Sequence, residues 1–190
     1  MHLAVFGASG RLGRQVLCVA GERGHTVKAA ARSAPFSLGG IDAVILTIGP
    51  PTPHDRPECA ATTAAILAAM REHGVERILC VTGAMIGDYP DNRTWLFGAL
   101  ARAIERKFPE LMADRAKQEE LIRSSGLRWT IFKPPRLTMG AGHRNVAVGP
   151  HVRAGLLSAV SRSDLARLLV EEAEHNHYEG RCVFLRTGIL

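Results

Sequence analysis

The sequence predicts an α/β domain built on a doubly wound parallel sheet. Short apolar runs alternate along the chain with longer segments that have the spacing of amphipathic helices, a pattern typical of strand–helix–strand units. A glycine-rich turn follows the first apolar run and opens the first helical segment. With 190 residues, 46% of them hydrophobic, the chain suits one domain with a single core, and we expect residues 1–190 to form it.

The first strand and the turn after it are the most informative stretch. Leu3–Phe6 reads as a short buried strand, and glycines follow at positions 7, 10 and 13. Gly7 permits a tight turn, Gly10 lets a phosphate approach the backbone, and Gly13 lets the helix pack closely on the strand. The free N–H groups of the first helical turn attract an anion, and the charge of Arg11 adds to this attraction. The turn therefore predicts a pyrophosphate site made by Gly7, Ser9, Gly10, Arg11, Leu12 and Gly13, although a glycine-rich turn without a ligand has the same local pattern.

The second predicted strand bears on the choice of cofactor. A helix is expected over residues 11–23 and a strand over residues 26–32, with Arg32 at the carboxyl end of that strand. This position lies beside the adenosine ribose in a Rossmann fold, where an acidic residue favours NAD and an arginine suits the 2′-phosphate of NADP. We therefore expect NADP (NADPH), with NAD less favoured, and expect Ser33 to share the phosphate. The alternative is a solvated arginine at the end of a strand.

The connection after this strand is too short for a complete Rossmann half. Only residues 34–41 separate it from the next apolar run, 42–49. A parallel crossover needs about a dozen residues or more. We therefore expect the third strand, an edge strand in the order 3-2-1-4-5-6, to be missing, unless the sequence omits a stretch of the natural protein.

The rest of the chain continues the alternation. Helices are expected over residues 58–73, 94–107, 110–124 and 164–174, and strands over 76–82, 127–132 and 181–185. Residues of about 85–110 and 138–160 follow strand ends and are expected to form a small substrate-loop region, with a lid at 85–93 and an active-site loop at 138–155.

The composition excludes several classes of function. The net charge is +6, but the basic residues are dispersed and only 5% of residues are aromatic, so we expect no nucleic-acid partner. No apolar run has the length of a membrane span, so no membrane partner is expected. Four cysteines without zinc-like spacing favour a reducing cytoplasm, and two of them, Cys18 and Cys80, lie in apolar segments and are expected in the core. The pair His175 and His177 lacks a third ligand, so no metal site is expected.

Several motifs together resemble one family. They are GASGRLG after the first strand, the strand-end Arg32, DAVILTIG, RILCVTGA, KQEELIRSSGLRWTIFKPPRLT and SRSDLARLL. The chain resembles the atypical short-chain dehydrogenase/reductases, in particular the NAD(P)H-binding group that contains NmrA-like proteins and biliverdin/flavin reductases. The similarity extends over nearly the whole chain, except for the missing third strand.

This resemblance implies further site residues. In the family the matching positions flank the adenosine ribose and the nicotinamide (Ile48, Gly49 and Pro50), lie beside the nicotinamide (Thr82 and Gly83) or cover it (Pro134 and Pro135). Lys117 takes the place of the lysine in the Y-x-x-x-K pair of short-chain enzymes and is a candidate catalytic residue, with Thr82 and Arg136. The tyrosine of that pair is replaced by Ala113.

The departures from the family pattern shape the functional prediction. Without the tyrosine, the usual general acid is absent; Tyr89 is a possible substitute, although a solvent-exposed loop tyrosine is the more common case. We expect hydride transfer from NADPH to a small-molecule acceptor of the flavin or quinone type, with Arg136 orienting or neutralising it. The alternatives are a non-catalytic NmrA-like NADP-binding regulator or redox sensor and, less favoured, an epimerase or dehydratase. A monomer or homodimer is expected.

Overall fold

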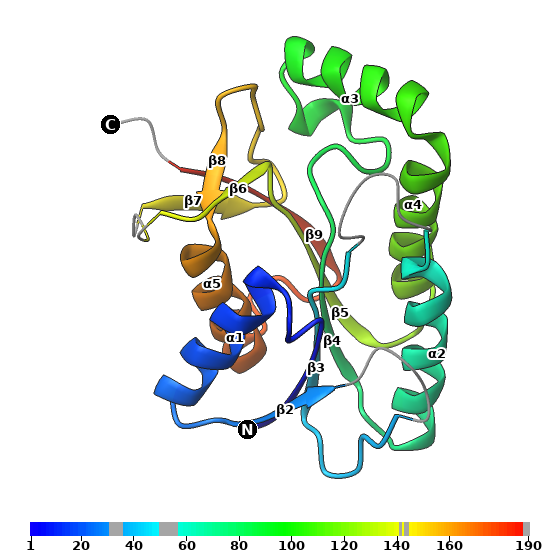
Figure 1. The fold of residues 1–190 in the computed structure, drawn as a ribbon, viewed down its shortest axis with the longest axis vertical. Coiled ribbons are helices and arrows are strands. Elements are labelled where there is room, and N and C mark those ends of the chain that lie inside the picture. Colours follow the sequence, from blue (N-terminus) through cyan, green and yellow to red (C-terminus); the bar gives the residue numbers. More distant parts are fainter. Residues whose placement is uncertain (31–35, 50–56, 141, 143–144, 188–190) are drawn as a thin grey trace.

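A seven-stranded sheet forms the centre of the computed structural model, which describes residues 1–30, 36–49, 57–140, 142 and 145–187. The strands lie in the order β2-β1-β3-β4-β5-β9-β7, and only β7 at one edge is antiparallel to its neighbour. Helices α1 and α5 cover one face of the sheet, and α2 and α4 cover the other (Figure 1). The doubly wound parallel sheet predicted from the sequence is therefore confirmed.

The elements follow the apolar patterning closely. The strands of the sheet are β1 (His2–Phe6), β2 (Thr26–Ala30), β3 (Ala43–Leu46), β4 (Arg77–Val81), β5 (Arg128–Lys133), β7 (Val146–Gly149) and β9 (Arg181–Thr187). The helices are α1 (Arg11–Glu22), α2 (Cys59–Glu72), α3 (Trp95–Lys107), α4 (Pro109–Arg123) and α5 (Arg162–His175), with a short 3₁₀ turn at Pro90–Asn92. A separate parallel pair is made by β6 (Arg136–Thr138) and β8 (Ala159–Ser161). No helix among the described residues combines the length and the apolar character needed to cross a membrane.

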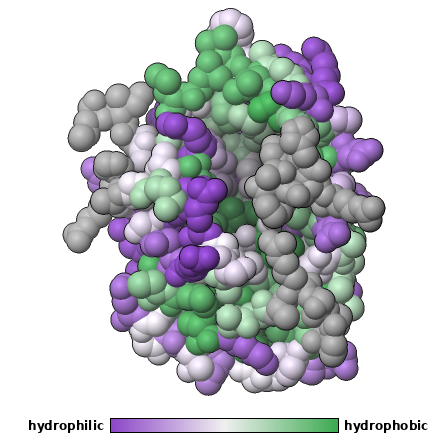
Figure 2. Space-filling view, in the orientation of Figure 1, coloured by the Kyte–Doolittle hydropathy of each residue, from purple (hydrophilic) through white to green (hydrophobic). Residues whose placement is uncertain are grey.

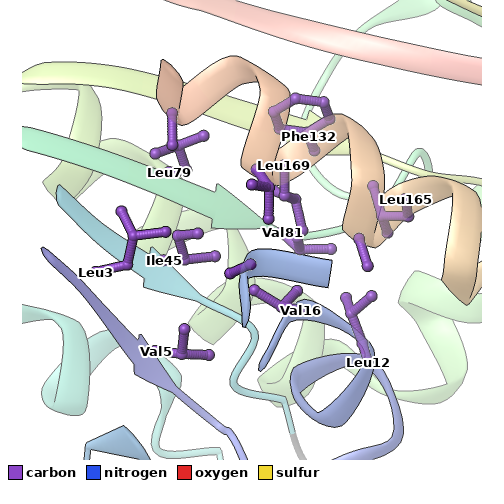
Figure 3. Packing of buried hydrophobic residues seen from close by; sticks show 14 of the residues in the cluster. Leu3, Val5, Leu12, Val16, Ile45, Leu79, Val81, Phe132, Leu165 and Leu169 are labelled. Atoms are coloured by element: carbon purple, nitrogen blue, oxygen red, sulfur yellow. The ribbon is translucent and has the colours of Figure 1, made fainter. Parts of the chain in front are cut away.

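A hydrophobic core lies on each face of the sheet, and the side chains along a strand alternate between the two cores. On the face of α1 and α5, Leu3 and Val5 from β1 point toward Val16 of α1 and Leu169 of α5 (Figure 3). The intervening residues of β1, among them Phe6, pack on the α2 side. On the face covered by α1 and α5, a buried ion pair of 2.7 Å between Arg77 of β4 and Glu172 of α5 links the sheet to the helix.

The edge beside β2 lacks a further strand in the described part of the chain. Strand β1 pairs with β2 on one side and β3 on the other, and residues 36–42, which lead into β3, contain no strand. The ring of Phe36 packs edge-to-face on Phe6 at 5.1 Å between ring centroids, so this short connection still covers the core. The expected absence of the third edge strand is confirmed for these residues.

Two sequence expectations about the elements of the fold are wrong. Residues 138–155 are not a continuous loop, because Val146–Gly149 forms β7, which pairs with the long carboxyl-terminal strand β9. Cys18 is exposed, and its thiol donates a hydrogen bond to Glu22. Cys18 lies among apolar residues in the sequence, but it is on the side of α1 opposite the buried stripe that includes Leu12 and Val16. Cys80 is buried as expected, and burial raises the pKa of its thiol to about 12.

Candidate functional site

The turn between β1 and α1 contains glycines at which any side chain would collide with neighbouring backbone atoms. Gly7 has a φ of +82°, and a Cβ added there would lie 2.8 Å from Oγ1 of Thr47. A Cβ on Gly13 would overlap the carbonyl oxygen of Gly7 and lie 2.7 Å from Cα of Ala8. The turn is closed by a hydrogen bond of 2.9 Å from the amide of Gly10 to the Gly7 carbonyl. Turn and helix thus meet at backbone distance, as expected for Gly7 and Gly13.

The amino end of α1 suits an anion. The N-cap of α1 is Gly10, which has no side chain to cap the helix, and the first turn of α1 contains no acidic residue. Ser9, Gly10 and Arg11 are exposed. Burial lowers the pKa of the nearby Arg162 guanidinium, and the positive charge of Arg11 lowers it further. Exposed amides, a helix dipole and two cations fit a pyrophosphate here.

A pocket of about 470 Å³ opens at the carboxyl ends of β3, β4 and β5. This is the edge of a parallel sheet at which ligands bind in doubly wound folds. Its walls are mainly apolar, and its lining residues are Gly49, Thr82, Gly83, Ala84, Met85, Ile86, Phe97, Leu100, Leu111, Met112, Arg115, Pro134, Pro135, Arg136, Leu156 and Ser158. Hydrophobic surface continues beyond it over α3 and the loop before β8, at the upper end of the molecule in Figure 2. The pocket suits a flat, largely apolar ligand.

A buried charge network lies behind Thr82. The hydroxyl of Thr82 donates to Oε1 of Glu119 at 2.6 Å, and Nζ of Lys133 donates to the same oxygen and to the carbonyl of Ile86 at 2.9 Å. Lys133 is fully buried, and burial lowers its pKa while Glu119 opposes that shift. The hydrogen atom of Thr82 therefore points to Glu119, which leaves the lone pairs of the hydroxyl to accept from a ligand.

Tyr89 belongs to the same network and is not the solvent-exposed loop tyrosine that its surroundings in the sequence indicate. Its hydroxyl lies 3.3 Å from Oε2 of Glu119 and 3.3 Å from Sγ of Cys182. Its ring faces Nζ of Lys133 at 4.4 Å and packs on Phe184. Burial raises the pKa of the phenol, and the phenol is not among the groups that line the pocket.

Arg115 is a pocket residue that the sequence analysis missed. It is 7% exposed, and its guanidinium donates to the carbonyls of Ile48 at 2.9 Å and Val81 at 2.8 Å. It therefore joins the chain just beyond β3 to the end of β4 at the floor of the pocket. The sequence carries one sign of this burial, because Arg115 falls on the same helical stripe as the apolar Met112 and Ile122.

The structure brings together most of the expected residues that it describes. Gly49, Thr82, Gly83, Pro134, Pro135 and Arg136 line the pocket. Ile48 is buried below them, with its carbonyl bound to Arg115. Arg32, Ser33 and Pro50 lie outside the described residues.

Lys117 is not brought to the pocket. Its side chain is 55% exposed and forms an ion pair of 3.1 Å with Glu120 on the outer face of α4. Ala113, at the position of the family tyrosine, lines a separate groove beside α3. Among the described residues no group of three His, Cys, Asp or Glu side chains could hold a metal ion.

The sequence profile of an NAD(P)H-binding family matches residues 37–176, which is more than half of the chain. The chain belongs to this family. The motif-based resemblance to NAD(P)H-binding proteins is thereby confirmed. A search of curated proteins found no match.

Solved structures with the same fold are numerous. A protein from Streptococcus pneumoniae, proposed to be an NADH-flavin reductase, is 25% identical with a TM-score of 0.76, over 99% of this chain and 100% of that one. The anaerobilin reductase ChuY from Escherichia coli is 18% identical with a TM-score of 0.78, over 100% and 98%. A short-chain dehydrogenase/reductase from Veillonella parvula, solved in complex with NADP, is 12% identical with a TM-score of 0.76, over 97% and 94%.

Proposed function

We propose that the protein is an NADPH-dependent reductase that passes a hydride to a flavin- or quinone-like small molecule. The observation that carries the proposal is the apolar pocket at the carboxyl ends of β3, β4 and β5, which lies at the same edge of the sheet as the glycine turn. The similarity to a proposed NADH-flavin reductase and to an anaerobilin reductase supports this choice.

The residues have separate tasks in this proposal. The turn from Gly7 to Gly13 holds the pyrophosphate, while Arg32 and Ser33 hold the 2′-phosphate. When bound, the nicotinamide supplies the hydride. Thr82, Gly83, Pro134 and Pro135 would hold it in the pocket, with Gly49 and Arg136 as further lining residues and Ile48 buried beneath. Pro50, which lies outside the described residues, remains a candidate for the same task.

The acceptor is inferred from the side chains that surround the pocket. The position of the family tyrosine holds Ala113 outside this pocket, and Lys117 is exposed. The hydroxyls of Thr82 and Tyr89 both point to Glu119. An acceptor that needs no proton from a side chain during hydride transfer fits this arrangement best, and flavins and quinones are of that kind.

Cofactor choice is tested by binding of NADPH and NADH to the wild type and to Arg32→Ala. We expect NADPH binding alone to weaken, by about 1.5–3 kcal/mol for a lost charge-assisted contact. Arg106→Ala, a change of an exposed arginine on α3, is the matched control and should alter neither affinity. Equal losses for NADPH and NADH in Arg32→Ala would refute the 2′-phosphate assignment.

Turnover is tested by NADPH oxidation with a panel of flavins, quinones and open-chain tetrapyrroles. Oxidation with a flavin or a quinone supports the reductase. Its absence across the panel, with NADPH binding intact, would refute it.

The second candidate is an NmrA-like regulator or redox sensor that binds NADP without turnover. The exposed Lys117 and the alanine at position 113 favour it, because a regulator needs no acid/base pair. Unequal affinities for NADP⁺ and NADPH without turnover would support this candidate. A cytoplasmic location, a monomeric or homodimeric state and the absence of nucleic-acid or membrane partners stay predictions.

A further inference from the structure

We infer that the pocket selects acceptors that become anions when the hydride arrives, and that Arg115 and Arg136 hold this charge until water supplies the proton. The inference rests on the proposed reductase function and narrows the substrate class. It starts from the charges that line the pocket: Arg115 and Arg136 are its charged lining residues among those described, and both are positive.

Arg115 carries a buried positive charge that its partners among the described residues do not neutralise. Within the described chain its hydrogen-bond partners are neutral groups, namely the carbonyls of Ile48 and Val81, Oε1 of Gln118 at 2.7 Å and the thiol of Cys59. Gln118 is in turn fixed by a bond of 2.9 Å from its amide to Oγ1 of Thr63. A buried charge without a counter-ion is costly, so its place at the floor of a ligand pocket points to a task there.

The acidic residues of α4 nearest to Arg115 in sequence are already engaged. Asp114 accepts from the backbone amides of Cys59 and Ala60 at 2.9 and 3.0 Å, where it caps α2. Glu119 is bound by Lys133 and Thr82. Neither forms an ion pair with Arg115 in the described structure. Among the described residues no ion pair offsets the charge of Arg115, so its positive potential acts on a ligand in the pocket.

Arg136 supplies a second cation from a different element. It is exposed on β6, directly after the double proline, and forms no ion pair with a described residue. The remaining walls are apolar, including Phe97, Leu100 and Leu111. A ligand that fits must be flat and apolar and must gain from two nearby positive charges.

Hydride transfer creates such a ligand. A neutral acceptor that takes a hydride gains two electrons and one hydrogen, so it becomes a monoanion while the cofactor leaves as NADP⁺. The anion then takes one proton from water to complete the two-electron reduction. Cations placed where this charge develops stabilise the transition state, which replaces the missing proton donor. Quinones and isoalloxazines can delocalise the charge, whereas simple ketones give a basic alkoxide that needs an acid.

The test compares two naphthalene ligands of similar size, the anionic naphthalene-2-carboxylate and the neutral naphthalene-2-methanol. We expect the wild type to bind the carboxylate about tenfold more tightly, a difference of about 1.4 kcal/mol. Arg136→Met should lose much of this preference and leave binding of the neutral alcohol unchanged. Arg102→Met, at an arginine that lines the groove beside α3, is the matched control and should keep the preference.

Arg115→Met should lose the preference as well, and Arg115→Lys should retain part of it because the charge stays. Since Arg115 joins two strand ends, its variants are interpreted only where the neutral alcohol still binds; Arg136→Met tests the inference if they do not fold. Equal binding of the two ligands to the wild type would overturn the inference, as would an unchanged preference in Arg136→Met and Arg115→Met.

A kinetic readout separates this inference from the proposed function. With a quinone as acceptor, kcat/KM should stay flat from about pH 6 to pH 9 and show no solvent isotope effect, because no side chain donates a proton in the step. A solvent isotope effect together with a pH dependence of kcat/KM would overturn the inference, while the proposed reductase function would be unaffected. Failure to oxidise NADPH with any acceptor would instead refute the reductase, on which the inference rests.

Discussion

Replacement of Glu119 by glutamine should destabilise the protein strongly, because it leaves Lys133 buried without a counter-charge. Lys133 is fully buried and Glu119 is 4% exposed, so water cannot take over the lost interaction. Removal of one partner of a buried ion pair costs about 3–5 kcal/mol. For a domain of this size that corresponds to a fall in Tm of roughly 6–20 °C.

The loss should also depend on pH. Burial lowers the pKa of Lys133 below its ordinary 10.5 and Glu119 opposes the shift, so the variant should lower that pKa further. Between the lowered pKa and 10.5 the unfolded chain binds more protons than the folded one, so the free energy of unfolding rises with pH. The deficit of Glu119→Gln relative to the wild type should therefore be smaller near pH 9 than near pH 7.

The measurement is urea unfolding at both pH values, with Glu120→Gln as the matched control. Glu120 is the next residue of α4, but it is 67% exposed and paired with the exposed Lys117. Its replacement should change the free energy of unfolding by less than about 1 kcal/mol. Equal losses in the two variants, or a Glu119→Gln deficit that grows with pH, would refute the reasoning.

Three further predictions concern other parts of the molecule. Gly13→Ala should lower the free energy of unfolding by about 1–3 kcal/mol and weaken NADPH binding, because the added methyl group overlaps the backbone of the turn. Gly21→Ala is the control in thermal unfolding: a Cβ there meets nothing within 4 Å, so the variant should stabilise α1 by about 0.5–1 kcal/mol. Arg77→Met should cost about 3–5 kcal/mol in urea unfolding, since it strands the carboxylate of Glu172; a cost below 1 kcal/mol would contradict this. Lys117→Ala should leave both the rate of NADPH oxidation and the Tm unchanged, and a large loss of rate would restore the lysine as a catalytic residue.

Local patterns were sufficient for most of the fold. Strand β3 is a continuous apolar run, and so are β1 and β4 after their first residues, which is how strands covered on both faces appear in a sequence. The glycine turn was predictable because glycines at this spacing are needed where the backbone of the helix packs directly on the backbone of the turn. The short run Val146–Gly149 carried no such signal, since its pairing with β9 depends on contacts across the chain.

The polar part of the site was harder to predict. Helix α4 is rich in charged residues, so Arg115 and Glu119 look like surface positions, and the resemblance directed attention to Lys117 instead. Their burial depends on how α4 packs against the sheet, which local propensity does not describe. Tyr89 was misjudged for the same reason, because its partners Glu119 and Cys182 are distant in sequence.

The tight packing of the glycine turn after β1 affects the affinity for a ligand. Its carbonyl at Gly7 accepts from Gly10, α1 presses on it at Gly13, and Thr47 closes the other side. The cradle is therefore preorganised: little backbone freedom remains to be lost when a diphosphate arrives, so more of the contact energy appears as affinity. Amide exchange at Gly10, whose N–H is bonded to the Gly7 carbonyl, should accordingly be slow even in the unliganded protein, whereas the free amides of the first turn of α1 should exchange quickly.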